Sequence, residues 1–175
     1  WVDGSSFSHF AMRSYYRLRE RGSHDNTWVR WADRNELRFS LRSVALNAPI
    51  FDRIFIVCED GSVPHWLASD DRVRIVPHSA IMPAEYLPNF CSCSIESFLH
   101  KIPDLSERFV YANDDFIFWA PVDRNFFFEG DRPRLVLHDH LVPSGPVDAR
   151  DDGHVAGKKN AEALLDRRFG KARRR

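Results

Sequence analysis

The chain has 175 residues, of which 43% are hydrophobic and 29% are charged, a composition typical of a globular domain. Its 25 basic and 25 acidic residues give a formal net charge of zero, which argues against a dedicated nucleic-acid-binding protein. No apolar run approaches the roughly 18 residues of a membrane-spanning helix, and three cysteines do not make a disulfide framework. We therefore expect a cytoplasmic protein without a transmembrane segment.

The first predicted element is a helix over residues 33–47. Asp33 followed three residues later by Glu36 has the spacing of a helix-capping box, and apolar residues then recur on one helix face. The helix should end before Pro49, because the residue before a proline avoids helical geometry.

Strands and helices alternate through the rest of the chain. Short apolar runs predict four strands, at residues 54–57, 73–76, 109–112 and 135–137. Helical spacing predicts two further helices, at residues 95–102 and 160–169. This order indicates an α/β fold with a mostly parallel sheet flanked by helices. Ligands of such sheets bind beyond the carboxyl ends of the strands, so the residues that follow each strand are the first candidates for a site.

Asn113, Asp114 and Asp115 follow the third predicted strand. Two carboxylates and an amide suit a hard cation such as Mg²⁺, which completes its coordination with water and phosphate oxygens. The alternative is an ordinary turn, because Asn and Asp are turn formers. Hydrophobic residues on both sides favour the metal site, since adjacent carboxylates inside an apolar run are costly to bury unpaired.

Arginines recur every four residues on the first predicted helix, at Arg34, Arg38 and Arg42. They form either a solvated face or a phosphate-binding face, for which the guanidinium group is well suited. Asn35 and Glu36 lie at the start of this helix, where backbone N–H groups favour an anion.

Histidines provide candidates for acid–base chemistry or metal binding. His78 follows the second predicted strand and His100 lies on the next helix, although a lone histidine is usually structural or exposed. His138 and His140 flank Asp139 in a pattern that suits a metal. The spacing of the three cysteines matches no common zinc site, so we do not expect a zinc centre.

Several runs, taken in order, resemble the Stealth family of capsular and exopolysaccharide phosphotransferases, which includes the animal enzyme that adds GlcNAc-1-phosphate to lysosomal glycoproteins. Residues 1–6 (WVDGSS) resemble the end of the family's first conserved region, and residues 33–128 resemble the second. The second region is carried by runs that include NELRFSLRS, HKIPDLSE and FVYANDD. Residues 129–175 would be a connector and a helix that lead to a third region. The chain is therefore expected to be one partial domain, incomplete at both ends.

The resemblance implies a Rossmann-like core, similar to glycosyltransferase A, that binds a nucleotide sugar. It implies transfer of a sugar-1-phosphate, such as GlcNAc-1-phosphate, to a hydroxyl of a capsular or exopolysaccharide glycan, with release of a nucleoside monophosphate. Mg²⁺ or Mn²⁺ would be held by Asp114 and Asp115. The expected catalytic residues are Asp115, His78 and Arg42. The expected substrate-binding residues are Asp3, Asn35, Glu36, Arg38, Ser92, His100 and Asn113.

The implied partners are a nucleotide-sugar donor and a glycan acceptor, with peripheral association at the inner face of the membrane with a polysaccharide-assembly complex. Two other functions stay open. A metal-dependent glycosyltransferase would share the fold and the acidic motif but would release a nucleoside diphosphate. An inactive glycan-binding fragment would be favoured if the third and fourth family regions, which are not recognisable here, are truly missing.

Overall fold

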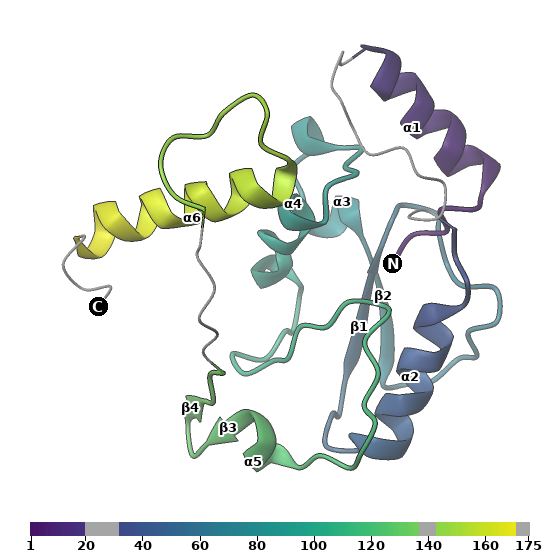
Figure 1. Cartoon of the computed structure of the whole chain (residues 1–175). Helices are drawn as coiled ribbons and strands as arrows, with labels where there is room; N and C mark the ends of the chain where they lie inside the picture. The colour runs from purple at the N-terminus through teal and green to yellow at the C-terminus, as the bar shows by residue number, and fades with distance from the viewer. Residues whose placement is uncertain (20–31, 137–142, 171–175) are drawn as a thin grey trace.

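The computed structural model describes residues 1–19, 32–136 and 143–170, and Figure 1 shows how their helices and strands are arranged. In chain order the elements are α1 (Phe7–Arg19), α2 (Glu36–Asn47), β1 (Ile54–Cys58), β2 (Val73–Pro77), α3 (His78–Ile81), the 3-10 helix η2 (Ala84–Tyr86), α4 (Ser92–Glu96), the 3-10 helix η3 (Leu99–Lys101), α5 (Arg124–Phe127), β3 (Phe128–Glu129), β4 (Arg132–Pro133) and α6 (Gly153–Phe169).

The central sheet is the parallel pair β1–β2. Ile54 is opposite Val73 at one end, and Cys58 is opposite Pro77 at the other. These strands confirm the predictions for residues 54–57 and 73–76, and they confirm a mixed α/β fold with a small parallel sheet. A second ladder, β3–β4, is antiparallel and two residues long.

Hydrophobic packing holds α2 and the later helices against this sheet. On one side, Val76 packs with Ile81, Met82 and Ile102 in a buried cluster. Full burial of such a side chain stabilises the fold by about 1.5–3 kcal/mol. On the side of α2, Leu37 is also buried. In Figure 1, α2 lies beside the β1–β2 pair, and the helices that follow β2 lie away from α2.

The predicted third strand, residues 109–112, is wrong for this structure, because the segment forms no strand and pairs with none of the strands among the described residues. Phe109 and Tyr111 are 45% and 47% exposed, so the apolar run does not form a buried sheet layer. The segment contacts its neighbours through side chains such as Tyr111 instead. The chain that follows it is held to α2 by a hydrogen bond. There, the Phe118 backbone nitrogen donates to Ser43 Oγ at 3.0 Å.

Two further predictions are corrected in detail. The helix predicted at residues 95–102 is divided into α4 and η3. Leu135 and Val136, predicted as part of a fourth strand, form no strand and are 78% and 80% exposed. Residue 137 of that prediction lies outside the described residues.

Two helices differ from the prediction: the last begins earlier, and the first was not predicted. The last helix is confirmed but begins at Gly153, because the Asp152 carboxylate caps it by accepting from the Val155 backbone nitrogen at 2.8 Å. Helix α1 was not predicted at all. Its signal was a serine cap, with Ser6 Oγ accepting from the His9 backbone nitrogen at 3.2 Å.

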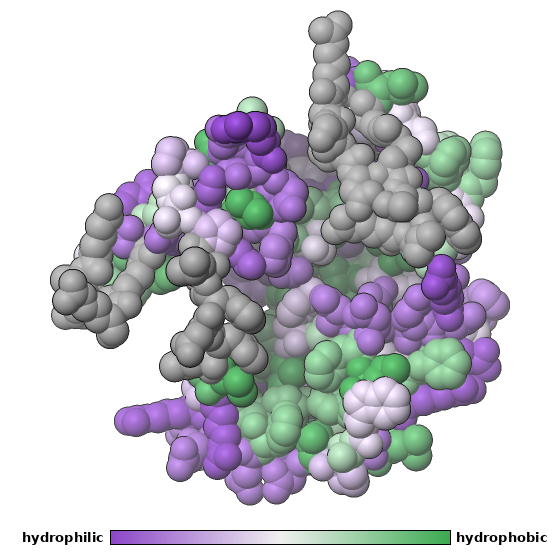
Figure 2. Space-filling view, in the orientation of Figure 1, coloured by the Kyte–Doolittle hydropathy of each residue, from purple (hydrophilic) through white to green (hydrophobic). Residues whose placement is uncertain are grey.

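Hydrophobic side chains also remain on the surface. Figure 2 shows them gathered on the lower half of this face, in the region of α5 and the end of α2 in Figure 1. Phe116 and Trp119 are 50% and 90% exposed. Within the described residues, we find no helix that is both long enough and apolar enough to cross a membrane.

Candidate functional site

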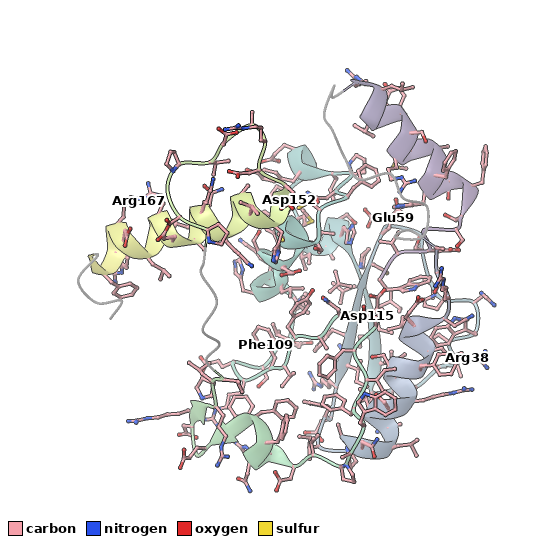
Figure 3. The ribbon with its side chains drawn as sticks, in the orientation of Figure 1. Arg38, Glu59, Phe109, Asp115, Asp152 and Arg167 are labelled. Carbon is pink, nitrogen blue, oxygen red and sulfur yellow. The ribbon has the colours of Figure 1, made fainter. Side chains whose placement is uncertain are left out.

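The carboxyl ends of β1 and β2 carry the candidate site. The N-terminal segment lies beside this edge, since the Trp1 backbone nitrogen donates to the Val57 carbonyl oxygen at 2.5 Å. Glu59 follows β1 and His78 follows β2. Figure 3 shows Glu59 at the upper end of the strands. Sheets of this kind bind ligands at this edge.

Carboxylates from three separate segments lie near enough here for their charges to act on one another. Burial raises the pKa of the Asp33 carboxyl, and the nearby negative charges of Glu36, Asp3 and Asp114 raise it further. A hydrogen bond from the Asn35 backbone nitrogen at 2.8 Å opposes this shift. We call Asp3, Asp33, Glu36 and Asp114 the acidic edge. A bound cation would relieve the repulsion between these groups.

The start of α2 places two of these carboxylates by a route that differs from the predicted capping box. Asn35 is the cap residue and has a left-handed backbone, with φ of 66°, and its side chain makes no capping bond. Asp33 accepts from the Asn35 backbone nitrogen, and Glu36 Oε2 accepts from the Arg34 backbone nitrogen at 2.6 Å. The two side chains therefore stabilise the turn before the helix, which holds Asp33 and Glu36 at the sheet edge.

Asn113, Asp114 and Asp115 form a turn, closed by a hydrogen bond from the Phe116 backbone nitrogen to the Asn113 carbonyl at 3.1 Å. Asp114 is half-buried and Asp115 is exposed. The turn interpretation is thus right for the backbone, while Asp114 also belongs to the acidic edge. Sequence reasoning missed the role of Asp33 beside it, since Asp33 was interpreted only as a helix cap.

Tyr111 holds this turn against α4. Its hydroxyl donates to Asn113 Oδ1 at 2.7 Å and to Glu96 Oε1 at 3.0 Å, and so shares one proton between them. Burial, followed by the hydrogen bond to Glu96, raises the pKa of Tyr111. Ser92 is exposed one helical turn before Glu96 on α4. It therefore lies on the helix face that approaches the turn.

The donor set of the turn suits a hard cation in its chemistry. Carboxylate and amide oxygens are the ligands that Mg²⁺ takes. However, within residues 1–19, 32–136 and 143–170 no three His, Cys, Asp or Glu side chains are placed to hold a metal ion by themselves. A cation bound by Asp114 and Asp115 would therefore take its other ligands from water or from a substrate.

His78 begins α3 and is only 3% exposed. Burial lowers the pKa of His78, while the negative charges of Asp60 and Glu59 act in the opposite direction. Asp60 also accepts from the Ser79 hydroxyl at 2.7 Å. The imidazole is therefore neutral at pH 7, the form that can accept a proton.

Of the other predicted histidines, the structure describes only His100, which does not join this group. His100 is exposed in η3. His138 and His140 lie outside the described residues.

Arg38 and Arg42 lie elsewhere. Both line a groove of about 340 Å³ on the outer side of α2, together with Trp66 and Arg72. The Arg38 guanidinium carbon lies 6.0 Å from the centre of the Trp66 ring. Figure 3 shows Arg38 at the right edge of the molecule, with Asp115 on the other side of α2. The structure thus brings Asp3, Asp33, Glu36 and Asp114 together but separates the arginines from them.

The known proteins to which the chain is similar have related names, all of them polysaccharide phosphotransferases. The family model described as "Stealth protein CR2, conserved region 2" matches residues 30–135. Exopolysaccharide phosphotransferase SCO2592 of Streptomyces coelicolor is 38% identical over 176 residues, which cover 97% of this chain and 19% of that protein. Capsular polysaccharide phosphotransferase SacB of Neisseria meningitidis serogroup A is 36% identical over 144 residues, which cover 81% of this chain and 26% of that protein.

A third relative is exopolysaccharide phosphotransferase CpsY of Mycobacterium leprae. It is 36% identical over 173 residues, which cover 97% of this chain and 32% of that protein. The chain therefore spans between about a fifth and a third of the length of these three relatives.

Proposed function

The chain belongs to the Stealth family, and from this premise we propose that it is the donor-binding part of a sugar-1-phosphate transferase. The enzyme moves a sugar-1-phosphate, such as GlcNAc-1-phosphate, from a nucleotide sugar to a hydroxyl of a capsular or exopolysaccharide glycan. The glycan hydroxyl oxygen forms a bond to the sugar-bearing phosphorus, the diphosphate bond breaks, and the nucleoside monophosphate leaves. The observation that carries the proposal is that the charges of Asp3 and Asp114 act on Asp33, on segments joined to the carboxyl end of β1 and to each other by the Trp1–Val57 and Asp33–Ser5 hydrogen bonds.

The charge of this edge determines how a donor binds. A diphosphate that approaches several carboxylates is repelled unless a cation lies between them. We propose that Asp114 and Asp115 hold Mg²⁺ or Mn²⁺, with Asn113 oriented by Tyr111 beside them. The cation supplies neutralisation of the diphosphate charge. Asp3 and Glu36 complete the rim that positions the nucleotide sugar.

The chemistry also needs a group that moves a proton from the attacking hydroxyl. We propose His78, because it lies at the same edge and burial keeps its imidazole neutral. Ser92 and His100 are proposed to contact the substrate from α4 and η3. Arg38 and Arg42 are proposed to bind phosphate oxygens, but from the groove on the other side of α2.

The wider setting follows from the same premise. The β1–β2 pair and the segment beside it would be part of a Rossmann-like core similar to glycosyltransferase A. Cys58, Cys91 and Cys93 are free thiols, which fits a reducing cytoplasm. We propose that the enzyme works at the inner face of the membrane, with a polysaccharide-assembly complex and without nucleic acid.

The test is to identify the nucleotide that is released. The longest available form of the protein is incubated with Mg²⁺, a panel of UDP-sugars and capsular oligosaccharides, and the nucleotides are separated by chromatography. We expect UMP, lost when EDTA removes the cation. UDP would instead indicate a glycosyltransferase, and glycan binding with no nucleotide release would indicate a glycan-binding module.

A further inference from the structure

The groove on the outer side of α2 combines positive charge with an apolar floor. Its rim carries Arg38, Arg42, Arg72 and the indole of Trp66. Its volume of about 340 Å³ lies at the lower end of the range for small-molecule sites. Its apolar lining comes from α2, the segment after it and the first residue of β1: Leu41, Val44, Ala45, Ala48, Phe51 and Ile54.

The arginines of this groove differ in whether a carboxylate pairs with them. Arg72 donates to the Asp70 carboxylate through Nη2 at 3.1 Å and through Nε at 3.3 Å. Asp70 is the acidic residue that lines the groove. Across the part of the chain that the structure describes, no carboxylate forms an ion pair with Arg38 or Arg42. Two guanidinium groups therefore remain available for an anionic ligand.

The form of the groove suits a phosphate attached to a sugar. Guanidinium groups bind phosphate with two parallel hydrogen bonds. An aromatic ring and an apolar floor accommodate the nonpolar face of a sugar ring. The open groove also accepts a unit that continues into a longer chain, because its rim is formed by exposed side chains such as Arg38 and Arg42.

We propose that this groove binds a phosphate-bearing sugar unit of the glycan acceptor. The proposal rests on the function proposed above, because each transfer creates a phosphodiester that the growing glycan then carries. Figure 3 shows Arg38 and Asp115 on opposite sides of α2. A donor whose diphosphate lies at the acidic edge therefore leaves the groove to another phosphate. A glycan chain is long enough to reach both places.

The test is a binding comparison with three probes: a phosphodiester-linked oligosaccharide, the same oligosaccharide without phosphate, and UDP-GlcNAc with Mg²⁺. The variant is Arg38→Gln with Arg42→Gln. Arg34→Gln is the matched control, since Arg34 is exposed on the same chain segment and does not line the groove. Arg38→Lys with Arg42→Lys keeps the charge without the bidentate geometry.

We expect the double glutamine variant to lose at least about tenfold in affinity for the phosphorylated oligosaccharide. The lysine variant should lose less, and affinity for UDP-GlcNAc should be unchanged in every variant. If the glutamine variant loses UDP-GlcNAc affinity instead, the groove belongs to the donor and the acceptor assignment is overturned. Equal losses in the Arg34→Gln control, or no loss at all, would also overturn it.

The outcome separates this proposal from the function on which it rests. Arginine-dependent binding of the phosphorylated oligosaccharide, together with absence of UMP release by the unmodified protein, would uphold the groove and reject the transferase. UMP release without such binding would uphold the transferase and reject the groove. Circular dichroism of each variant confirms that it folds.

Discussion

The two sides of helix α2 differ sharply in charge. Asp33 and Glu36 belong to the acidic edge at the carboxyl ends of the strands, whereas Arg38 and Arg42 line the groove on the outer side. Glu36 and Arg38 are two positions apart, and helical residues at that spacing do not face each other. One short helix thus separates a site where phosphate needs a cation from a site where phosphate meets arginine directly.

This comparison is broken most strongly by removing the two proposed cation ligands, of which Asp114 belongs to the acidic edge. Asp114→Asn with Asp115→Asn should lower transfer activity at least about a hundredfold, because the proposed cation loses both charged ligands. The initial rate of nucleotide release measures the change. Asp52→Asn is the control, because this exposed carboxylate lies at the opposite end of β1. Equal losses in both variants would refute the metal assignment.

A smaller effect is expected from the residue that positions Asn113. Tyr111→Phe removes the hydroxyl that contacts Asn113 and Glu96. We expect the Mg²⁺ concentration that gives half-maximal activity to rise about tenfold, as for other groups that orient metal ligands. The Tm should change little. Tyr86→Phe, at an exposed tyrosine of η2, is the matched control. A change in Tm without a shift in the Mg²⁺ titration would mean that Tyr111 is merely structural.

His78 should make the fold more sensitive to acid. Burial lowers its pKa from the ordinary value of 6.5, so the unfolded chain binds a proton before the native state does. The contribution of the neutral His78 to the free energy of unfolding should therefore be fully present above about pH 6.5 and be lost as the pH falls below it. Urea unfolding at pH 7.5 and 5.5 should show a larger loss for the unmodified protein than for His78→Gln.

The control for this experiment is His65→Gln, at an exposed histidine, which should keep the full pH dependence. If His78→Gln and the unmodified protein lose the same stability between the two pH values, the buried imidazole is not the group responsible.

The smallest expected effect concerns Asp33. Its pKa is raised by burial and by neighbouring carboxylates, so its charged form costs stability as the pH rises through the native pKa. Asp33→Asn removes that charge and keeps an oxygen that accepts from the Asn35 backbone nitrogen. Tm at pH 7.5 should rise by roughly 1–3 °C while Mg²⁺-dependent donor binding weakens. A lower Tm would show that the negative charge is stabilising.

Sequence patterns predicted the elements whose residues show a consistent period. The strands at 54–57 and 73–76, and the end of α2 before Pro49, match the structure. The run at 109–112 failed because its aromatic side chains are half-exposed, and an apolar run alone does not show whether a strand partner is present. Helix α1 was missed although Ser6 supplied a cap signal.

The candidate site was predictable only where its residues follow a local sequence pattern. The positions of His78 after β2 and of the Asn113–Asp115 turn follow from local sequence. The contribution of Asp33 to the acidic edge does not, because segments distant in the chain bring it near Asp3 and Asp114. The separation of Arg38 from the aspartates also depends on how α2 packs on the sheet, which local spacing does not show.

The most direct measurement follows the phosphate itself. A UDP-sugar labelled with ³²P in the phosphate next to the sugar is incubated with the protein, Mg²⁺ and a capsular oligosaccharide, and the products are separated by size and charge. The account predicts that the label enters the glycan as a phosphodiester while unlabelled UMP is released. Label that stays in released UDP, with sugar alone added to the glycan, would contradict it.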